Sequence, residues 1–389
     1  MFELLRLPRF ATLAVLAALL GLGSGAARAL YDVEPDEIPG RSGNPQRIWP
    51  LEGGGPGVRG GKADAFRILY RSTNPRGQPI PVSGAIFIPT GPAPAGGRNI
   101  ITWAHPTSGV VPLMPDVGGM MWDLDAMIGQ GYIVVATDYP GLGTAGIHPY
   151  LIGESEARAV VDSVRAARDM PNSGATNRFA VWGHSQGGHA ALYTGEVAAR
   201  YAPDLTLVGV AAAAPATYLV ELFDADAATA QDLVAMSVLS WTSLENVPLT
   251  QVVEPAAMSA FEQTARDCIE SVAEFEAIEK AESPLTREKY LKVNPAKAEP
   301  WEGIMQHNSP GQAPAGAPVF IAQGTADTTV NPAITKRFGE ALCAQGVRVS
   351  FVELPGVTHT FAARDSANAA LNWMNDRFRG EPAPSSCER

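Results

Sequence analysis

The stretch "RFAVWGHSQGGHAALYTGEVAARY", residues 178–201, joins an apolar run to a helical pattern through a turn rich in glycine. A buried strand that passes so quickly into a helix is typical of parallel sheets covered by helices. Gly183 and Gly187 flank Ser185 at two residues' distance, and a side chain at either position would hold strand and helix apart. We therefore predict that Ser185 stands on a strained turn at the edge of such a sheet.

The same alternation of strand and helix recurs along most of the chain. Residues 66–91 read as two strands around the turn 74–77, and helical periodicity marks residues 155–170. Further apolar strands are expected at 99–103, 131–141, 206–216, 317–325 and 348–354, with helices at 331–346 and 366–378. This order predicts the α/β class, with a mostly parallel sheet and helices on both faces. The stretch 30–62, rich in Gly and Pro, is expected to be surface coil.

The alternation stops after Ala216 and resumes near residue 317. Residues 217–300 show helical character with acidic runs such as "EFEAIEKAE". We predict a core formed by residues 30–216 and 301–389, with 217–300 inserted as a helical cap. Trp241, Met258 and Phe261 of this segment either line a pocket or hold the cap together.

The first residues have the pattern of an export signal. Arg6 and Arg9 precede the apolar run 11–23, and "ARA" ends at Ala29 with small residues in an A-x-A cleavage pattern. An uncleaved membrane anchor is the alternative, but the run is shorter than the roughly 20 residues that a spanning helix needs. We predict that residues 1–29 are removed and that the protein is periplasmic or extracellular.

Without residues 1–29 the chain has 26 basic and 39 acidic residues, a balance of −13. Such an acidic surface argues against nucleic acid as a partner, because phosphate binding needs clustered Lys and Arg. Oligomeric state cannot be predicted from this balance. Of the three cysteines, we predict that Cys343 pairs with Cys387 and ties down the C-terminal tail, leaving Cys268 over.

A serine nucleophile needs a base and an acid that orients the base. On a strand–turn–helix of this kind the chain order is Ser, then Asp or Glu, then His. Asp327 follows the apolar strand 317–325, and His359 follows the strand 348–354. We predict Ser185 as nucleophile, Asp327 as acid and His359 as base. The alternatives are Asp327 as a helix cap, His359 as an ordinary loop histidine, and Asp224 or Asp226 as the acid.

The reaction also needs donors for the oxyanion that forms on the substrate. The backbone N–H of Gln186, at the start of the helix after Ser185, is the first candidate. The second is Thr107 in "AHPTSG", through its N–H and hydroxyl, because Pro106 has no N–H to donate. Alternatively, His105-Pro106 is only a bend.

The remaining histidines have weaker claims. His184 should point away from Ser185, His189 should pack on the following helix, and His148 and His307 have no predicted role. The spacing of "HSQGGH" is not that of a metalloprotease motif, so no metal is expected. No cofactor is expected either. The stretch "GLGTAG", residues 141–146, resembles a dinucleotide-binding loop, but the helical pattern begins too far beyond these glycines for such a site. A loop bordering the pocket is the better interpretation.

Together these segments resemble the secretory lipase family, the lipase-A-like group of the α/β-hydrolases. The resemblance lies in "YRSTNPRGQPIPVSG", "TWAHPTSG", "GYIVVATDYPGLGTAGIHPYL", "ARAVVDSVRAAR", "WGHSQGGHAAL", "GTADTTVNP" and "GVTHTF". It implies an exported hydrolase of carboxylic esters, acylglycerols included, with contact to a lipid interface. It also implies Ser185, Asp327 and His359 as the catalytic residues.

Two departures concern the oxyanion loop and the region after it. The family's usual H-G-T is His105-Pro106-Thr107 here, and "VVPLMPDVGG" replaces a cysteine-containing segment. The family's acyl specificity is therefore not carried over. An acyltransferase with the same three residues, or a silent surface-binding module on the same fold, are the alternative functions.

Overall fold

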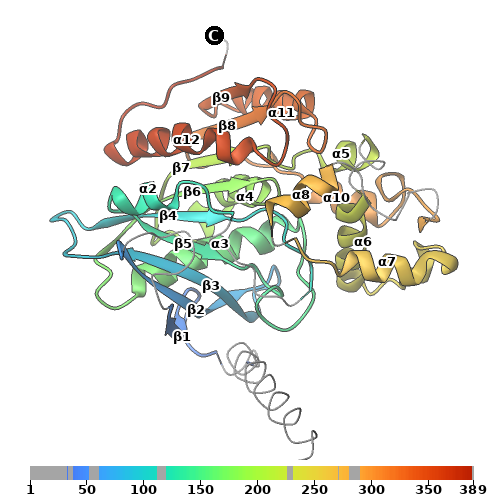
Figure 1. Cartoon of the computed structure of the whole chain (residues 1–389), viewed down its shortest axis with the longest axis horizontal. Helices are drawn as coiled ribbons and strands as arrows, with labels where there is room; N and C mark the ends of the chain where they lie inside the picture. The colour runs from blue at the N-terminus through green and yellow to red at the C-terminus, as the bar shows by residue number, and fades with distance from the viewer. Residues whose placement is uncertain are drawn as a thin grey trace, which may run out of the picture.

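The computed structural model describes residues 33, 38–51, 61–111, 120–225, 231–269, 271–279 and 290–387. A nine-stranded sheet runs through the molecule in the order β1-β2-β3-β5-β4-β6-β7-β8-β9 (Figure 1). The strands are β1 Pro45–Pro50, β2 Ala63–Thr73, β3 Pro79–Pro89, β4 Arg98–Ala104, β5 Ile133–Thr137, β6 Ala175–His184, β7 Thr206–Ala213, β8 Val319–Gly324 and β9 Val349–Leu354. Strands β1, β2, β3 and β5 pair antiparallel, and all pairs from β5 through β4 to β9 are parallel.

Helices cover both faces of the sheet, because strand residues alternate between two apolar clusters. In β6, Phe179 and Val181 pack toward one face, while Ala180 and Trp182 pack toward the other. The first face is covered by α3 Gly153–Asp169, α4 Gln186–Tyr201 and α11 Pro332–Ala344, and the second by α2 Leu124–Gly129 and α12 Ala362–Arg379. The predicted α/β class, with a mostly parallel sheet, is confirmed.

The prediction of coil for residues 30–62 is wrong at β1. Pro45–Pro50 forms an edge strand that pairs antiparallel with β2. The two prolines conceal this strand in the sequence, yet an edge strand tolerates proline because one of its sides donates to no neighbour.

Between β7 and β8 the chain leaves the sheet and forms several helices. These are α5 Leu219–Ala225, α6 Gln231–Glu245, α7 Met258–Ala265, α8 Val272–Glu279 and α10 Trp301–His307, with 3₁₀ turns η3 Leu249–Gln251, η4 Pro255–Ala257 and η5 Pro295–Lys297. Helices α6, α7, α8 and α10 gather at one end of the sheet (Figure 1). Helices α5, α6, α7 and α10 share an apolar cluster in which Trp241 and Phe261 are fully buried, so these two side chains hold those helices together.

The division into a core and a cap at residues 217–300 stays a proposal; α10 packs in the same cluster as the inserted helices. The predicted signal, residues 1–29, and Asp226 lie outside the described residues. Within the described ranges, none of the helices has the length and apolar character of a membrane-spanning segment.

The C-terminal tail lies along the free edge of β9. The N–H of Ser386 donates to the carbonyl oxygen of Val349 at 2.7 Å, and the N–H of Phe351 donates to the Ser386 hydroxyl at 2.9 Å. A disulfide joins Cys343 of α11 to Cys387 in this tail, which confirms the predicted pairing. The tail thus covers backbone groups that an edge strand would otherwise expose.

Candidate active site

The turn after β6 holds Ser185 in a backbone conformation that L-residues rarely adopt, with φ 57° and ψ −118°. A Cβ at Gly183 would lie 2.1 Å from the carbonyl oxygen of Gly187, and one at Gly187 would lie 1.8 Å from that of Ala104. Both contacts are impossible for real atoms, so the turn can form only with glycine at these positions. The predicted strained turn is confirmed, with β4 packed directly against it.

Three loops bring Ser185, His359 and Asp327 together at one edge of the sheet. The Ser185 hydroxyl lies 2.8 Å from Nε2 of His359, and Nδ1 of His359 lies 2.9 Å from Oδ2 of Asp327. Because the carboxylate accepts, Nδ1 donates to it and Nε2 is left to accept from the hydroxyl. All three residues are at most 5% exposed.

The surroundings of Asp327 fix its carboxylate. Oδ1 accepts from the backbone N–H groups of Thr329 and Val330 at 2.9 and 2.7 Å, and Oδ2 also accepts from Nε2 of Gln323 at 2.9 Å. The cap of α11 is Asn331, whose side chain accepts from the N–H of Ala333, so Asp327 is not the helix cap.

The alternative acid Asp224 lies at the end of α5. Its carboxylate accepts from Asn294 and pairs with Lys297, each at 2.9 Å. These are partners from the inserted segment, whereas the acid that meets His359 is Asp327.

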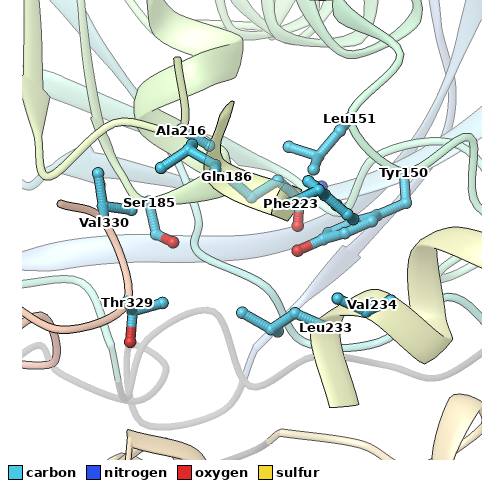
Figure 2. Close-up of a pocket in the computed structure, with 11 residues that line it drawn as sticks. Tyr150, Leu151, Ser185, Gln186, Ala216, Phe223, Leu233, Val234, Thr329 and Val330 are labelled. Carbon is cyan, nitrogen blue, oxygen red and sulfur yellow. The ribbon is translucent and has the colours of Figure 1, made fainter. Parts of the chain in front are cut away.

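A pocket with an empty volume of about 480 Å³ opens beside Ser185. Figure 2 shows the hydroxyls of Ser185 and Tyr150 directed toward each other from opposite sides of this pocket, with Leu233 and Val234 of α6 along a third side. Its lining is mostly apolar and comes from six short stretches of the chain: Tyr150, Leu151, Ser185, Gln186, Ala216, Leu222, Phe223, Leu233, Val234, Thr329 and Val330. The inserted helices thus supply one wall.

The two predicted oxyanion donors differ in how they are placed relative to the pocket. Gln186 lines the pocket and is the first residue of α4, so its N–H has no partner within the helix. Thr107 is buried, and its hydroxyl lies 2.7 Å from that of Tyr150, which lines the pocket. Nδ1 of His105 lies 2.6 Å from the Pro106 carbonyl oxygen, which closes the bend before Thr107.

His184 faces away from the Ser185 hydroxyl, as predicted. Its Nε2 donates to the carbonyl oxygen of His359 at 2.9 Å, and the two rings lie 5.0 Å apart. Burial, with the neighbouring His359, lowers the pKa of His184 to about 3, so it stays neutral. It therefore steadies the backbone of His359.

Sequence reasoning missed a second buried polar group, centred on Glu156 of α3. Its Oε2 lies 2.8 Å from Nδ1 of His189, and its Oε1 accepts from Nε2 of Gln186 at 2.8 Å. Burial alone would raise the pKa of Glu156, but its polar contacts, that with His189 among them, outweigh this effect and lower the pKa to about 2. The carboxylate is therefore ionised in the interior.

A signal for Glu156 was present in the sequence. It lies four residues before Val160 and eight before Val164, so it continues the apolar stripe of its helix. A carboxylate on such a stripe must be buried, and a buried carboxylate needs partners.

The glycine-rich loop 141–146 packs against the sheet. A Cβ at Gly143 would lie 1.7 Å from the Ser83 hydroxyl oxygen, and Gly141 has φ 82°. The helix α3 begins only at Gly153. Residues Tyr150 and Leu151, at the end of this connection, line the pocket.

Comparison with known proteins agrees with this geometry. The model of the secretory lipase family matches residues 118–386. Lipase A of Moesziomyces aphidis is 26% identical over 165 residues, which cover 38% of this chain but only 34% of that protein. A protein of Mycobacterium tuberculosis named a probable inactive lipase is 23% identical over 345 residues, covering 82% of this chain and 74% of its own.

Among solved structures, lipase A of Candida antarctica in its closed state superposes with a TM-score of 0.73 at 18% identity. The match covers 90% of this chain and 86% of that one. At this identity the likeness establishes the fold, which is the α/β-hydrolase fold. Since the family model spans most of the sequence, the chain belongs to the secretory lipase family.

Proposed function

We propose that this protein is an exported serine hydrolase that cleaves carboxylic esters through an acyl-enzyme on Ser185. The observation that supports this most strongly is the hydrogen-bonded series from the Ser185 hydroxyl through His359 to Asp327 at the mouth of an apolar pocket. His359 removes the proton of Ser185 as its oxygen attacks the ester carbonyl, and then protonates the leaving alcohol. Water, activated by His359, releases the acid.

The oxyanion of each tetrahedral intermediate is held by the N–H of Gln186, with Thr107 as the second donor. Gln186 N–H stands at the positive end of α4, where an anion is favoured. The mostly apolar lining of the pocket suits the acyl chain of a lipid or small-molecule ester. The inserted helices cover this acyl chain on one side of the pocket.

Export after cleavage near Ala29 belongs to the same proposal. It is supported by the family's description as secretory and by the disulfide between Cys343 and Cys387, a bond favoured outside the cytosol.

The test combines turnover with covalent labelling. The wild-type protein should hydrolyse a short p-nitrophenyl ester and react with a fluorophosphonate at Ser185, identified by peptide mass. Ser185→Ala should abolish both while keeping the circular dichroism of the wild type. If the wild type neither turns over the ester nor takes the label, the chain is a silent member of its family.

Turnover in the presence of an added alcohol separates hydrolase from acyltransferase. A hydrolase forms mainly free acid, whereas an acyltransferase forms the new ester in its place. We expect free acid.

A further inference from the structure

The carboxylate of Glu156 lies beneath the turn that holds Ser185, fully buried on the first turn of α3. Its Oε1 accepts from Nε2 of Gln186 at 2.8 Å and from the N–H of Leu151 at 3.0 Å. Its Oε2 accepts from Nδ1 of His189 at 2.8 Å. One carboxylate thus binds the pocket wall and two side chains of α4.

Gln186 and His189 are three residues apart on α4, so they lie on one face of its first turn. Their shared partner therefore fixes the rotation of this turn against α3. The Gln186 side chain has a second anchor, because its Nε2 lies 2.7 Å from Nε2 of His148. Nδ1 of His148 faces the carbonyl oxygen of Pro140 at 2.9 Å and so donates to it, which leaves Nε2 to accept from Gln186.

The orientation of this turn matters for catalysis because the Gln186 N–H belongs to it. Ser185 is held at a positive φ, a strain that persists only where surrounding contacts impose it. The backbone contributes three such contacts: the N–H of Ser185 donates to the carbonyl oxygen of Ala213, and its own carbonyl oxygen accepts from the N–H groups of His189 and Ala216. The side-chain contacts to Glu156 act on the same turn.

We propose that Glu156 is a positioning residue, whose carboxylate clamps the first turn of α4 through Gln186 and His189 so that the Gln186 N–H points at the oxyanion. This inference rests on the proposed function of Ser185. Glu156 touches no substrate and acts through Gln186.

The clamp is electrically balanced. Nε2 of His189 lies 2.8 Å from the carbonyl oxygen of Asn308, and Nδ1 faces the carboxylate. Both oxygens only accept, so both nitrogens donate and the imidazolium cancels the charge of Glu156. The clamp therefore adds no net negative charge behind the oxyanion.

The test measures turnover per reactive serine. A fluorophosphonate counts the sites that can react, and ester turnover is divided by that count, so partly unfolded protein does not affect the result. Glu156→Ala should lower this kcat by about tenfold with KM within twofold, a part of the 10²–10³-fold that loss of a whole oxyanion donor costs. In Glu156→Gln the kcat per reactive serine should fall less, because the amide oxygen of the new side chain still accepts from Gln186 and Leu151.

The matched control is Asp162→Asn, at another fully buried carboxylate of α3 that bonds to Ser72 and Tyr201 away from the turn. It should leave kcat per site within twofold. A kcat per site in Glu156→Ala within twofold of the wild type, or a fall of similar size in the control, would overturn the proposal.

A second variant approaches the clamp from its other end. Gln186→Met keeps the backbone N–H but loses both side-chain anchors, so it should also lower kcat per site by about tenfold. The double variant should lose much less than the product of the two single effects, because both disrupt one contact. If Glu156→Ala does not fold, an unchanged kcat per site in Gln186→Met alone overturns the proposal. A wild type without label or turnover would instead refute the proposed function itself.

Discussion

Two carboxylate–histidine pairs flank the turn after β6, and they have almost the same internal geometry. Asp327 and His359 lie 2.9 Å apart on one side, and Glu156 and His189 lie 2.8 Å apart on the other. All four residues are buried. What differs is the second nitrogen of each imidazole: Nε2 of His359 faces the Ser185 hydroxyl, whereas Nε2 of His189 faces the carbonyl oxygen of Asn308.

This difference assigns the two pairs opposite tasks. A hydroxyl can give up its proton, so His359 is placed to act as a base. A carbonyl oxygen accepts only, so His189 must keep both protons and can serve only as a structural cation. A carboxylate next to an imidazole therefore does not by itself define a catalytic pair. The partner of the second imidazole nitrogen, Nε2, determines whether the histidine can act as a base.

Replacing His359 should have the largest effect on activity. His359→Ala removes the proposed base of the reaction, and loss of a triad histidine costs about 10⁶-fold in kcat in a well-studied serine protease. We expect ester turnover to fall by at least about 10⁴-fold. Stopped assays with long incubation would measure the remaining activity. A fall in turnover of less than tenfold would contradict a role for His359 in the mechanism.

Asp327→Asn should have the next largest effect. The amide can donate to Nδ1 of His359 and so favours the tautomer that cannot accept from Ser185, which costs about 10⁴-fold in kcat in comparable enzymes. KM should change little. Asp224→Asn is the matched control, since this carboxylate pairs with Lys297 on the surface; equal losses in both variants would contradict the assignment.

The two pairs also show what could be predicted from the sequence. Ser185, Asp327 and His359 each follow an apolar strand, and parallel strands end at one edge, so their meeting was predictable. Glu156 was not found, because the stripe of Val160 and Val164 was read as apolar alone. The strand β1 is not predictable in this way, because its prolines suggest coil. The hydrogen-bond partner of Nε2 in each histidine depends on loops distant in sequence, such as the one at Asn308.

Acid should weaken the Glu156–His189 pair in a way that its variants reveal. The folded pKa of Glu156, about 2, is below its ordinary value of 4.5, so its contribution to stability is present above pH 4.5 and is lost as the pH falls toward 2. The difference in unfolding free energy between wild type and Glu156→Gln should therefore shrink from pH 5 to pH 3. Urea titrations at both pH values measure it.

Asp162 provides the control of opposite sign on the same helix. Burial raises its pKa to about 6 despite bonds from Tyr201 and Ser72, so its ionisation costs stability as the pH rises from 4 to 6. The wild type should lose stability relative to Asp162→Asn over that range. Parallel slopes for the two carboxylates would contradict the difference in their environments.

The smallest effect on activity is expected at the C-terminal tail, which contacts neither pair. Cys387→Ser opens a disulfide between cysteines 44 residues apart and should cost about 2–4 kcal/mol of stability, measured by urea unfolding. The kcat at 25 °C should stay within twofold of the wild type. A large loss of kcat in folded protein would mean that the tail communicates with the site.

The most direct test of the division between the two pairs is the rate at which a fluorophosphonate labels Ser185 in His359→Ala and in His189→Gln, with folding checked by circular dichroism. The account predicts almost no labelling without His359, and labelling within about tenfold of the wild-type rate without His189, since only positioning is disturbed. Rapid labelling of folded His359→Ala, or abolished labelling of folded His189→Gln, would contradict it.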